Sequence, residues 1–285
     1  MTVKLIDLNQ KHWLNHTDRQ HRGTNVPNKS ETIDFSKFKV SCSACSLREL
    51  CLPLGLSNED LQRLENTIKR PRPIHKSDYL FRMGDECRSL YTVRAGSIKT
   101  LISTDEGEEQ IMGFHLPGEL FGLDGLETDI HTCSAVALET TSICELPINQ
   151  FETLCQSIPG LGHQMHRLIG KEVTTDHEML FLLGKKDAEE RLSSFLLSIS
   201  KRLNQRGFSA HEFYLSMSRQ DIGNYLGLAL ETVSRQFTHF QDEGIISVER
   251  RHITIHDMDR LKHIAIKSSH DMGRKTRKPP TTLKS

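Results

Sequence analysis

The chain has 285 residues, of which 36% are hydrophobic, and its 37 Lys and Arg residues are balanced by 37 Asp and Glu residues. Length and composition are typical of a soluble globular protein with one large core or two domains of ordinary size. No run approaches the roughly 18 apolar residues that would cross a membrane, and the N-terminus lacks the apolar core of a signal peptide, so we expect no membrane partner and a cytoplasmic location.

The balanced net charge hides an asymmetry between the two ends of the chain. From Lys185 to the C-terminus, 18 Lys and Arg residues stand against 12 Asp and Glu residues, a net charge of +6, so residues 1–184 carry −6. A basic C-terminal third favours contact with a polyanion such as DNA. A basic surface that faces only solvent would give the same count, so charge alone does not decide.

The first notable feature is a cluster of cysteines. Residues 1–40 are polar and are interrupted by Gly and Pro, which predicts a disordered leader. The segment CSACSLRELC then places Cys42, Cys45 and Cys51 within ten residues of a chain that has seven cysteines. In a reducing cytoplasm such a cluster favours a metal or redox site over a disulfide framework.

The spacing of these cysteines limits the kind of site that they can form. Cys42 and Cys45 could share one face of a helix, but Cys51 would lie on the opposite face, so three ligands of one centre require a loop. A tetrahedral or cubane site also needs a fourth donor. Spacing favours ligation over free thiols, but it does not choose among the remaining cysteines, which are Cys87, Cys133, Cys144 and Cys155.

From about residue 64 to residue 146, short apolar runs alternate with turn signals. Examples are residues 90–93, 98–102 and 111–116, which are followed by Ala95-Gly96-Ser97, Asp105-Glu106-Gly107 and Pro117-Gly118-Glu119. Short strands at spacings of about 8 to 12 residues predict an antiparallel β-barrel or sandwich.

A long helix is predicted after Pro159-Gly160. One face of this helix would carry a stripe of five residues, Ile169, Val173, Asp176, Leu180 and Leu183. They are separated by four, three, four and three positions, which is the spacing of a coiled coil. The stripe fits either ordinary core or the seam of a dimer. Asp176 would be costly to bury in such a seam, because two copies would face each other across a twofold axis, so the dimer would be weak or Asp176 would lie just off the seam.

The segment SMSRQDIGNYLGLALETVSRQFTHFQDEG predicts a helix-turn-helix. Ser218 is a candidate N-cap, and Gly227 ends the first helix. The second helix presents a polar face with Glu231, Ser234 and Arg235, whose side chains suit hydrogen bonds to base edges. Residues 245–255 then predict a strand, a basic turn at Arg250-Arg251 for phosphate contacts, and a second strand, which makes the motif a winged variant.

These patterns predict an α+β chain with the following parts. We expect a disordered leader over 1–40, a cysteine loop with an antiparallel β-barrel or sandwich over 41–158, a long helix over 159–185, a winged helix-turn-helix over 186–266, and a basic tail over 267–285.

Taken together, the motifs resemble the FNR (fumarate and nitrate reduction) group of the Crp/Fnr superfamily of bacterial regulators. The resemblance runs from about Cys42 to Ile266 and includes GDECRSLYTVRAGSIK, GFHLPGEL, LETTSICELP, LLGKKDAEERL, RGFSAHEF and DIGNYLGLALETVSR. It implies that residues 41–158 form a jelly-roll-like (cupin-like) β-barrel sensor domain and that the helix over 159–185 is a dimerisation helix. It also implies an oxygen-responsive transcription activator that binds DNA as a homodimer, with RNA polymerase as a further partner.

The resemblance also implies roles for individual residues. A [4Fe-4S] cluster would be bound by Cys42, Cys45, Cys51 and Cys144, and oxygen would convert the cluster and inactivate the dimer. Glu231, Ser234 and Arg235 would read TTGAT-type half-sites of an inverted repeat. Cys87, Cys133 and Cys155 match no ligand position.

Three other interpretations fit parts of the sequence. The nucleotide-binding relatives place an Arg after their Gly-Glu turn, whereas this chain has no Arg or Lys from Gly113 to Met165, so we expect no cyclic nucleotide. The cysteines could instead form a zinc site or a nitric oxide or thiol redox sensor, because thiolates suit several metals. The third interpretation is an iron–sulfur electron carrier or enzyme with an incidental helix-turn-helix; because the chain shows no catalytic constellation, we expect no enzyme activity.

Overall fold

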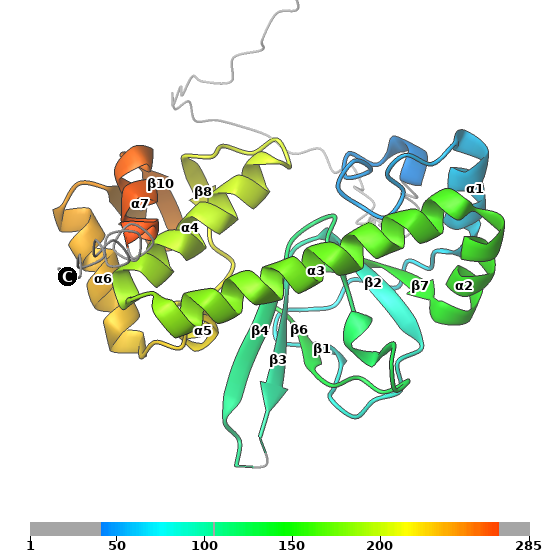
Figure 1. The fold of residues 1–285 in the computed structure, drawn as a ribbon, viewed down its shortest axis with the longest axis horizontal. Helices are drawn as coiled ribbons and strands as arrows, with labels where there is room; N and C mark the ends of the chain where they lie inside the picture. The colour runs from blue at the N-terminus through cyan, green and yellow to red at the C-terminus, as the bar shows by residue number, and fades with distance from the viewer. Residues whose placement is uncertain (1–40, 105, 268–285) are drawn as a thin grey trace, which may run out of the picture. The chain divides into compact units, whose positions relative to one another are not determined.

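The computed structural model describes residues 41–104 and 106–267, which fold as an α+β chain (Figure 1). The predicted leader, and the predicted basic tail apart from Lys267, lie outside these residues. No helix within the described ranges is long and apolar enough to cross a membrane.

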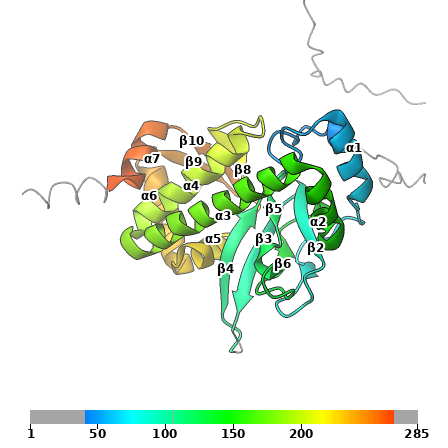
Figure 2. The ribbon, with the colours of Figure 1, turned by 45° about the vertical axis from the view of Figure 1, so that its right-hand side comes forward.

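Two antiparallel sheets form the N-terminal half of the described chain. Their strand orders are β1-β6-β3-β4 and β5-β2-β7. The strands are β1 (Tyr79–Phe81), β2 (Ser89–Ala95), β3 (Ile98–Ser103), β4 (Glu109–His115), β5 (Leu120–Phe121), β6 (Ser134–Ala137) and β7 (Ser142–Pro147). The β3–β4 hairpin extends beyond the neighbouring strands (Figure 2). The strands expected from residues 90–93, 98–102 and 111–116 are confirmed as β2, β3 and β4, except that β4 ends one residue before the expected run does.

The sheets are jelly-roll-like, but they do not close into the predicted barrel. Strand β1 has three residues and β5 has two, so these edge strands are too short to join one sheet to the other through a continuous ladder. The space between the sheets is filled by apolar side chains, among them Phe81, Val93 and Phe121. The domain is therefore an antiparallel sandwich, one of the two predicted forms, and not a closed barrel.

A second core joins the cysteine segment to the first turns of the long helix. The segment begins with a short 3-10 helix (Cys42–Ala44) and leads into α1 (Asn58–Thr67), while α2 (Ile148–Ser157) and α3 (Pro159–Lys185) follow the sheets. Leu52 and Leu64 pack in one buried cluster with Phe151, Leu161 and Met165. The cysteine segment is thus packed against the same core as the N-terminal part of α3.

The C-terminal domain contains a helix-turn-helix and a three-stranded wing. Its elements are α4 (Ala188–Asn204), β8 (Glu212–Tyr214), α5 (Arg219–Leu226), α6 (Leu230–Asp242), β9 (Ile246–Glu249), β10 (His252–Ile255) and α7 (Met258–Ala265). The sheet order is β8-β10-β9, so the wing has one strand more than predicted. Residues 212–214 were missed because a three-residue strand carries too little alternation to be recognised.

The C-terminal domain shares its core with one face of the sheet domain. Leu101, Ile111 and Phe114 of β3 and β4 belong to the same buried cluster as Phe195 of α4 and Leu226 of α5. Because these side chains pack together, a displacement of β3 or β4 would also displace the helices of the C-terminal domain.

Candidate functional site

The four cysteines singled out in the sequence line one cavity. Cys42, Cys45 and Cys51 come from the N-terminal segment, and Cys144 comes from β7. Cys144 pairs with Thr92 of β2 in the sheet register, and the Cys51 thiol lies 3.9 Å from the Thr92 hydroxyl. The segment wraps as a series of turns from Cys42 to Gly55 rather than as one helix, which is the loop that three converging cysteines require.

The cavity wall is largely apolar, and burial there disfavours the thiolate form of three of the four cysteines. Burial raises the pKa of the Cys42 and Cys144 thiols and raises the pKa of Cys51 to about 12. A thiol with a raised pKa becomes a thiolate only when a strong positive partner replaces its proton. The site therefore suits a group that supplies positive charge to several sulfurs at once.

A half-buried ion pair borders this cavity and was not recognised from the sequence. The Arg70 Nη1 atom lies 2.7 Å from the carboxylate of Glu65, whose Oε2 atom also accepts a 2.6 Å hydrogen bond from the Cys42 amide. Burial opposes the ionisation of Glu65, but its hydrogen bonds from Arg70 and Cys42 lower its pKa to about 2. No spacing signal marks these two residues, because they become neighbours only where α1 ends.

Arg70 has two further donor nitrogens beside the cavity, Nη2 and Nε, and only Nη2 has a neighbouring acceptor among the described residues. Its Nη2 atom lies 3.8 Å from the Sγ atom of Cys42, and its charge lowers the pKa of Cys144, which burial otherwise raises. The Nε atom of Arg70 is buried and has no hydrogen-bond partner among the described residues. A buried donor without an acceptor is unfavourable, and an anionic group held by the thiolates would satisfy it.

The cavity residues therefore fit an iron–sulfur cluster. Within residues 41–104 and 106–267, no three His, Cys, Asp or Glu side chains already stand in the arrangement that holds a single metal ion. What the structure does offer is four thiols around a shared cavity, an apolar wall and a cationic donor. These are the groups that a cluster bound by four thiolates requires.

The other three cysteines lie outside this cavity. Cys87 and Cys133 are buried near Asp124, and the Cys87 thiol lies 3.6 Å from the Gly122 carbonyl oxygen. Cys155 is partly buried in α2, where burial and the charge of Glu152 raise the pKa of its thiol. Position alone thus separates these cysteines from the four that converge.

The predicted stripe on α3 is largely exposed. The exposed fractions of Ile169, Val173 and Leu180 are 37%, 48% and 69%. Asp176 is also exposed, whereas Leu183 is half-buried. Apolar side chains in this spacing on an exposed helix face are suited to pack against a second helix.

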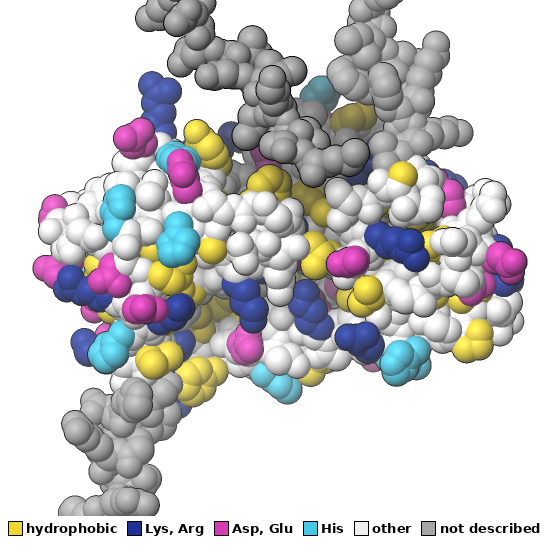
Figure 3. Space-filling view, turned by 90° about the horizontal axis from the view of Figure 1, so that it is seen from above, with side chains coloured by type: hydrophobic (Ala, Val, Ile, Leu, Met, Phe, Trp, Pro, Cys, Tyr) yellow, Lys and Arg dark blue, Asp and Glu magenta, His cyan; other side chains and the backbone are white. Residues whose placement is uncertain are grey.

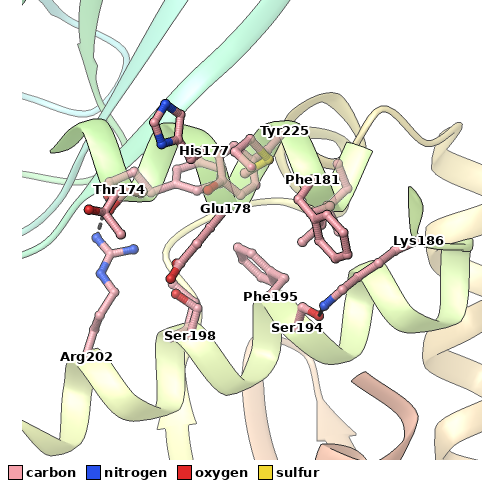
Figure 4. Close-up of a pocket in the computed structure, with 16 residues that line it drawn as sticks. Thr174, His177, Glu178, Phe181, Lys186, Ser194, Phe195, Ser198, Arg202 and Tyr225 are labelled. Carbon is pink, nitrogen blue, oxygen red and sulfur yellow. Dashed lines mark hydrogen bonds between the residues drawn. The ribbon is translucent and has the colours of Figure 1, made fainter. Parts of the chain in front are cut away.

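A groove runs between α3 and α4 beside this stripe (Figure 4). Phe181 reaches into the groove from α3, while Phe195 and Arg202 reach into it from α4. The sequence pattern did not reveal the groove, because its two walls come from helices whose packing angle is a tertiary property.

The helix-turn-helix follows the predicted signals closely. Ser218 caps α5 in a reciprocal capping box with Asp221, and Gly227 ends the helix with a positive φ of 61°. Helix α6 buries Val233 and Phe237 against the domain core. These predictions are confirmed.

The polar residues of α6 stand on its outer face. Glu231 and Arg235 are exposed, and Ser234 is half-buried. The wing places Arg250 and Arg251 in the turn between β9 and β10, where Arg250 adopts a positive φ of 59°. The arrangement puts base-edge donors and acceptors on one helix and cationic side chains on an adjacent turn.

The visible face in Figure 3 carries basic, acidic and His side chains intermixed rather than one basic field. Of the net charge of +6 from Lys185 to the C-terminus, residues 185–267 contribute only +2, from 13 Lys and Arg residues against 11 Asp and Glu residues. Within the described residues, α6 and the wing offer particular side chains for contact with DNA.

Comparison with known proteins gives two family matches and close relatives. Residues 190–264 match the Crp-like helix-turn-helix domain, and residues 71–158 match the cyclic nucleotide-binding domain. The chain is 50% identical over 237 residues to the transcriptional activator protein anr of Pseudomonas aeruginosa, covering 83% of this chain and 97% of that protein. It is 46% identical over 226 residues to the fumarate and nitrate reduction regulatory protein of Escherichia coli K12, covering 79% of this chain and 90% of that protein.

The chain belongs to the FNR group of the Crp/Fnr superfamily. Among solved structures, FixK2 from Bradyrhizobium japonicum is similar with a TM-score of 0.62 and 30% identity, over 70% of this chain and 96% of that one. The predicted family is confirmed.

Membership in the Crp/Fnr superfamily establishes the broad role. The chain is a DNA-binding transcription regulator rather than an enzyme, and its relatives include transcriptional activators. Its sheet domain matches the cyclic nucleotide-binding domain by sequence, so the nature of its signal has to be argued from the residues that fill that domain.

Proposed function

We propose that the chain is an oxygen-responsive transcription activator that binds a [4Fe-4S] cluster through Cys42, Cys45, Cys51 and Cys144. The observation that carries the proposal is the convergence of these four thiols on one cavity in which the Arg70 Nε donor lacks an acceptor. When bound, the cluster supplies the oxygen-reactive group. Every other part of the switch is made by the chain itself.

The chain transmits the state of the loop through packing. With all four cysteines engaged, the N-terminal segment is tied to β7, and Leu52 is held against Leu161 and Met165 of α3. That contact orders the first turns of the long helix and favours packing of its exposed stripe against a second copy. When the four cysteines no longer share the intact group, the loop is released and this support is lost.

Asp176 tunes the strength of the dimer. It lies between Val173 and Leu180 in the stripe, and its carboxylate is exposed in one subunit. Two such carboxylates would approach each other on dimerisation, and like charges that lose water repel each other. The seam is thus weak enough that its formation depends on the loop.

The dimer presents two recognition helices to DNA. On a twofold-symmetric dimer, two copies of α6 would enter successive major grooves about 34 Å apart, which matches an inverted repeat. Arg235 would pair with guanine, Glu231 would accept from cytosine, and Ser234 would add a further contact, in agreement with TTGAT-type half-sites. We further propose RNA polymerase as the partner of the DNA-bound dimer, because relatives of this chain are transcriptional activators.

The interior of the sheet domain argues against a cyclic nucleotide as the signal. Between the sheets, the Phe81 ring stacks on Tyr91, Phe121 and His131, with ring centroids 3.6 to 6.4 Å apart. The carboxylate of Glu119 is already engaged by Arg202 and Arg206 of the C-terminal domain. Among the described residues, a cyclic phosphate between the sheets would have to displace these stacked rings, and Arg202 and Arg206 already have Glu119 as their partner.

Anaerobic purification tests the proposal. The absorption spectrum, the iron and sulfide content, and binding to a duplex carrying a TTGAT inverted repeat are measured before and after exposure to air. We expect a brown protein with about four irons per subunit, and DNA binding that is lost as the colour bleaches. A colourless protein that binds DNA equally in both atmospheres would leave a transcription regulator whose cysteines hold zinc or act as redox-active thiols.

A further inference from the structure

The turn between β4 and β5 contacts the cysteine loop. Gly118 has a φ of +89°, and a Cβ atom placed on it would lie 3.1 Å from the Leu50 Cβ atom and 3.6 Å from the Leu47 Cβ atom. Both leucines belong to the stretch between Cys45 and Cys51. The turn is therefore in direct packing contact with the segment whose conformation depends on the cysteines.

The next residue of the same turn reaches the C-terminal domain. The Glu119 side chain is 14% exposed, and its Oε1 atom accepts hydrogen bonds from Arg202 Nε at 2.9 Å and from Arg206 Nη2 at 2.7 Å. Arg202 also bonds the other carboxylate oxygen, and Arg206 Nε donates to the Pro117 carbonyl oxygen at 2.6 Å. Both arginines come from α4 and the residues directly after it.

This three-residue cluster is a strong and specific connection. The Arg206 side chain is only 2% exposed and that of Arg202 is 23% exposed. Breaking one partner of a buried ion pair leaves an uncompensated charge, so the cluster resists small displacements and moves as a unit. A shift of the turn must therefore displace the end of α4 or break the cluster.

We propose that the turn at Pro117–Glu119 carries the state of the cysteine loop to the DNA-binding domain within one subunit, with Glu119 as the positioning residue that fixes α4 through Arg202 and Arg206. This inference rests on the proposed function, in which the loop is the part that changes. It adds a route that does not pass through dimerisation of α3. A change in the loop shifts Gly118, and with it Glu119 and the end of α4. Because α4 shares a core with the helix-turn-helix, its position determines the position of that motif.

A second ion pair offers a matched control. The Lys99 Nζ atom of β3 lies 2.7 Å from the carboxylate of Asp221 in α5, and the two side chains are 17% and 16% exposed. This pair also joins the sheet domain to the C-terminal domain, with similar burial. It lies on β3, outside the turn at Pro117–Glu119. If ion pairs merely hold the two domains together, losing either should have the same effect.

The test is amide hydrogen exchange at residues 201–206 of the full-length protein, purified and measured without exposure to air, so that the cysteine loop keeps its ligated conformation, and without DNA. Leu50→Gly, which removes the Cβ atom that packs against Gly118, should speed exchange there by about fivefold or more, the lower end of ordinary coupling between sites. The same substitution should have the same effect in a Lys99→Met background. In a Glu119→Gln background it should add nothing further, because the connection is already cut.

Two results would overturn the proposal: unchanged exchange in Leu50→Gly alone, or an equal effect of Leu50→Gly with and without Glu119→Gln. Should Glu119→Gln fail to fold by circular dichroism, Arg206→Gln takes its place; because Arg202 still holds Glu119, the effect of Leu50→Gly should then be reduced rather than abolished, and an undiminished effect would overturn the proposal. The iron content is measured separately. If the protein holds no cluster but the effects on exchange are non-additive, the route through Glu119 stands and only the proposal of an oxygen sensor is refuted.

Discussion

The guanidinium group of Arg70 lies against the thiol of Cys42, with 3.8 Å between Nη2 and Sγ, while Glu65 fixes its other end at 2.7 Å. The cysteine cavity thus has a cation oriented toward it by a second side chain. Partners of this kind commonly decide how tightly a metal group is held and how exposed it is to attack.

Replacing Arg70 with Leu should therefore weaken the site without removing a ligand. We expect iron retention during anaerobic gel filtration to fall by about tenfold, and bleaching in air to be faster, because the negative charge on the thiolates loses its compensation. Arg70→Lys should retain part of the effect. The matched control is Arg72→Leu, whose side chain is exposed, and equal behaviour of Arg70→Leu and Arg72→Leu would refute the role of Arg70.

Cys144 should be essential for the cluster, whereas Cys155 should not. Cys144→Ser removes the only donor that comes from β7, so the loop would no longer be tied to the sheet, and we expect iron to be nearly absent. Cys155 lies outside the cavity, so the Cys155→Ser protein should keep the iron content and the visible spectrum of the unchanged protein. Loss of iron in Cys155→Ser with retention in Cys144→Ser would reverse the assignment of ligands.

The exposed stripe on α3 should control the oligomeric state. Leu180 exposes 69% of its surface, and Leu180→Glu would place a charge in the seam, so the anaerobic protein should sediment as a monomer. Asp176→Ala removes the like charges and should leave a dimer in air. Both effects are read by analytical ultracentrifugation in the two atmospheres. A monomeric Asp176→Ala protein in air would argue against electrostatic control by this carboxylate.

Local signals in the sequence were sufficient for much of the molecule. Ser218 and Gly227 mark the ends of α5 through capping chemistry that involves only neighbouring residues, and the short apolar run of residues 111–116 before a turn signal is enough to place most of β4. The loop form of the cysteine segment followed from the angular spacing of Cys42 and Cys51. In each case, the deciding interaction lies within a few residues of the chain.

Contacts between distant segments were not predictable. Arg70 meets the cavity only because α1 packs on the sheet domain, and Glu119 meets Arg206 only because α4 lies across the β4–β5 turn. The fourth cysteine illustrates the same limit. Spacing left Cys87, Cys133, Cys144 and Cys155 equivalent, and only resemblance, followed by the strand register opposite Thr92, distinguishes Cys144.

Acid should destabilise the metal-free protein through His115. Burial lowers the pKa of this side chain to about 4, and its ring nitrogen is hydrogen-bonded to the Thr100 hydroxyl at 3.1 Å. Between pH 6.5 and 4 the unfolded chain binds a proton that the folded chain does not, so the stability present above pH 6.5 is lost as the pH falls, by about 1 kcal/mol per pH unit. Urea unfolding at pH 7 and pH 5 should show this loss, and His115→Gln should reduce it; an unchanged slope in His115→Gln would assign the loss to other groups.

Arg235 and Arg250 should separate sequence reading from phosphate contact. Arg235→Ala removes a bidentate donor on the outer face of α6, so affinity for a TTGAT repeat should fall by about 10- to 100-fold while binding to unrelated DNA changes little. Arg250→Ala removes a cation from the wing turn, so both affinities should fall together and the dependence of affinity on salt should become shallower. Fluorescence anisotropy with the two duplexes over a salt series distinguishes them. A uniform loss in Arg235→Ala would mean that this arginine contacts phosphate, and that the specificity of α6 depends on Glu231 and Ser234.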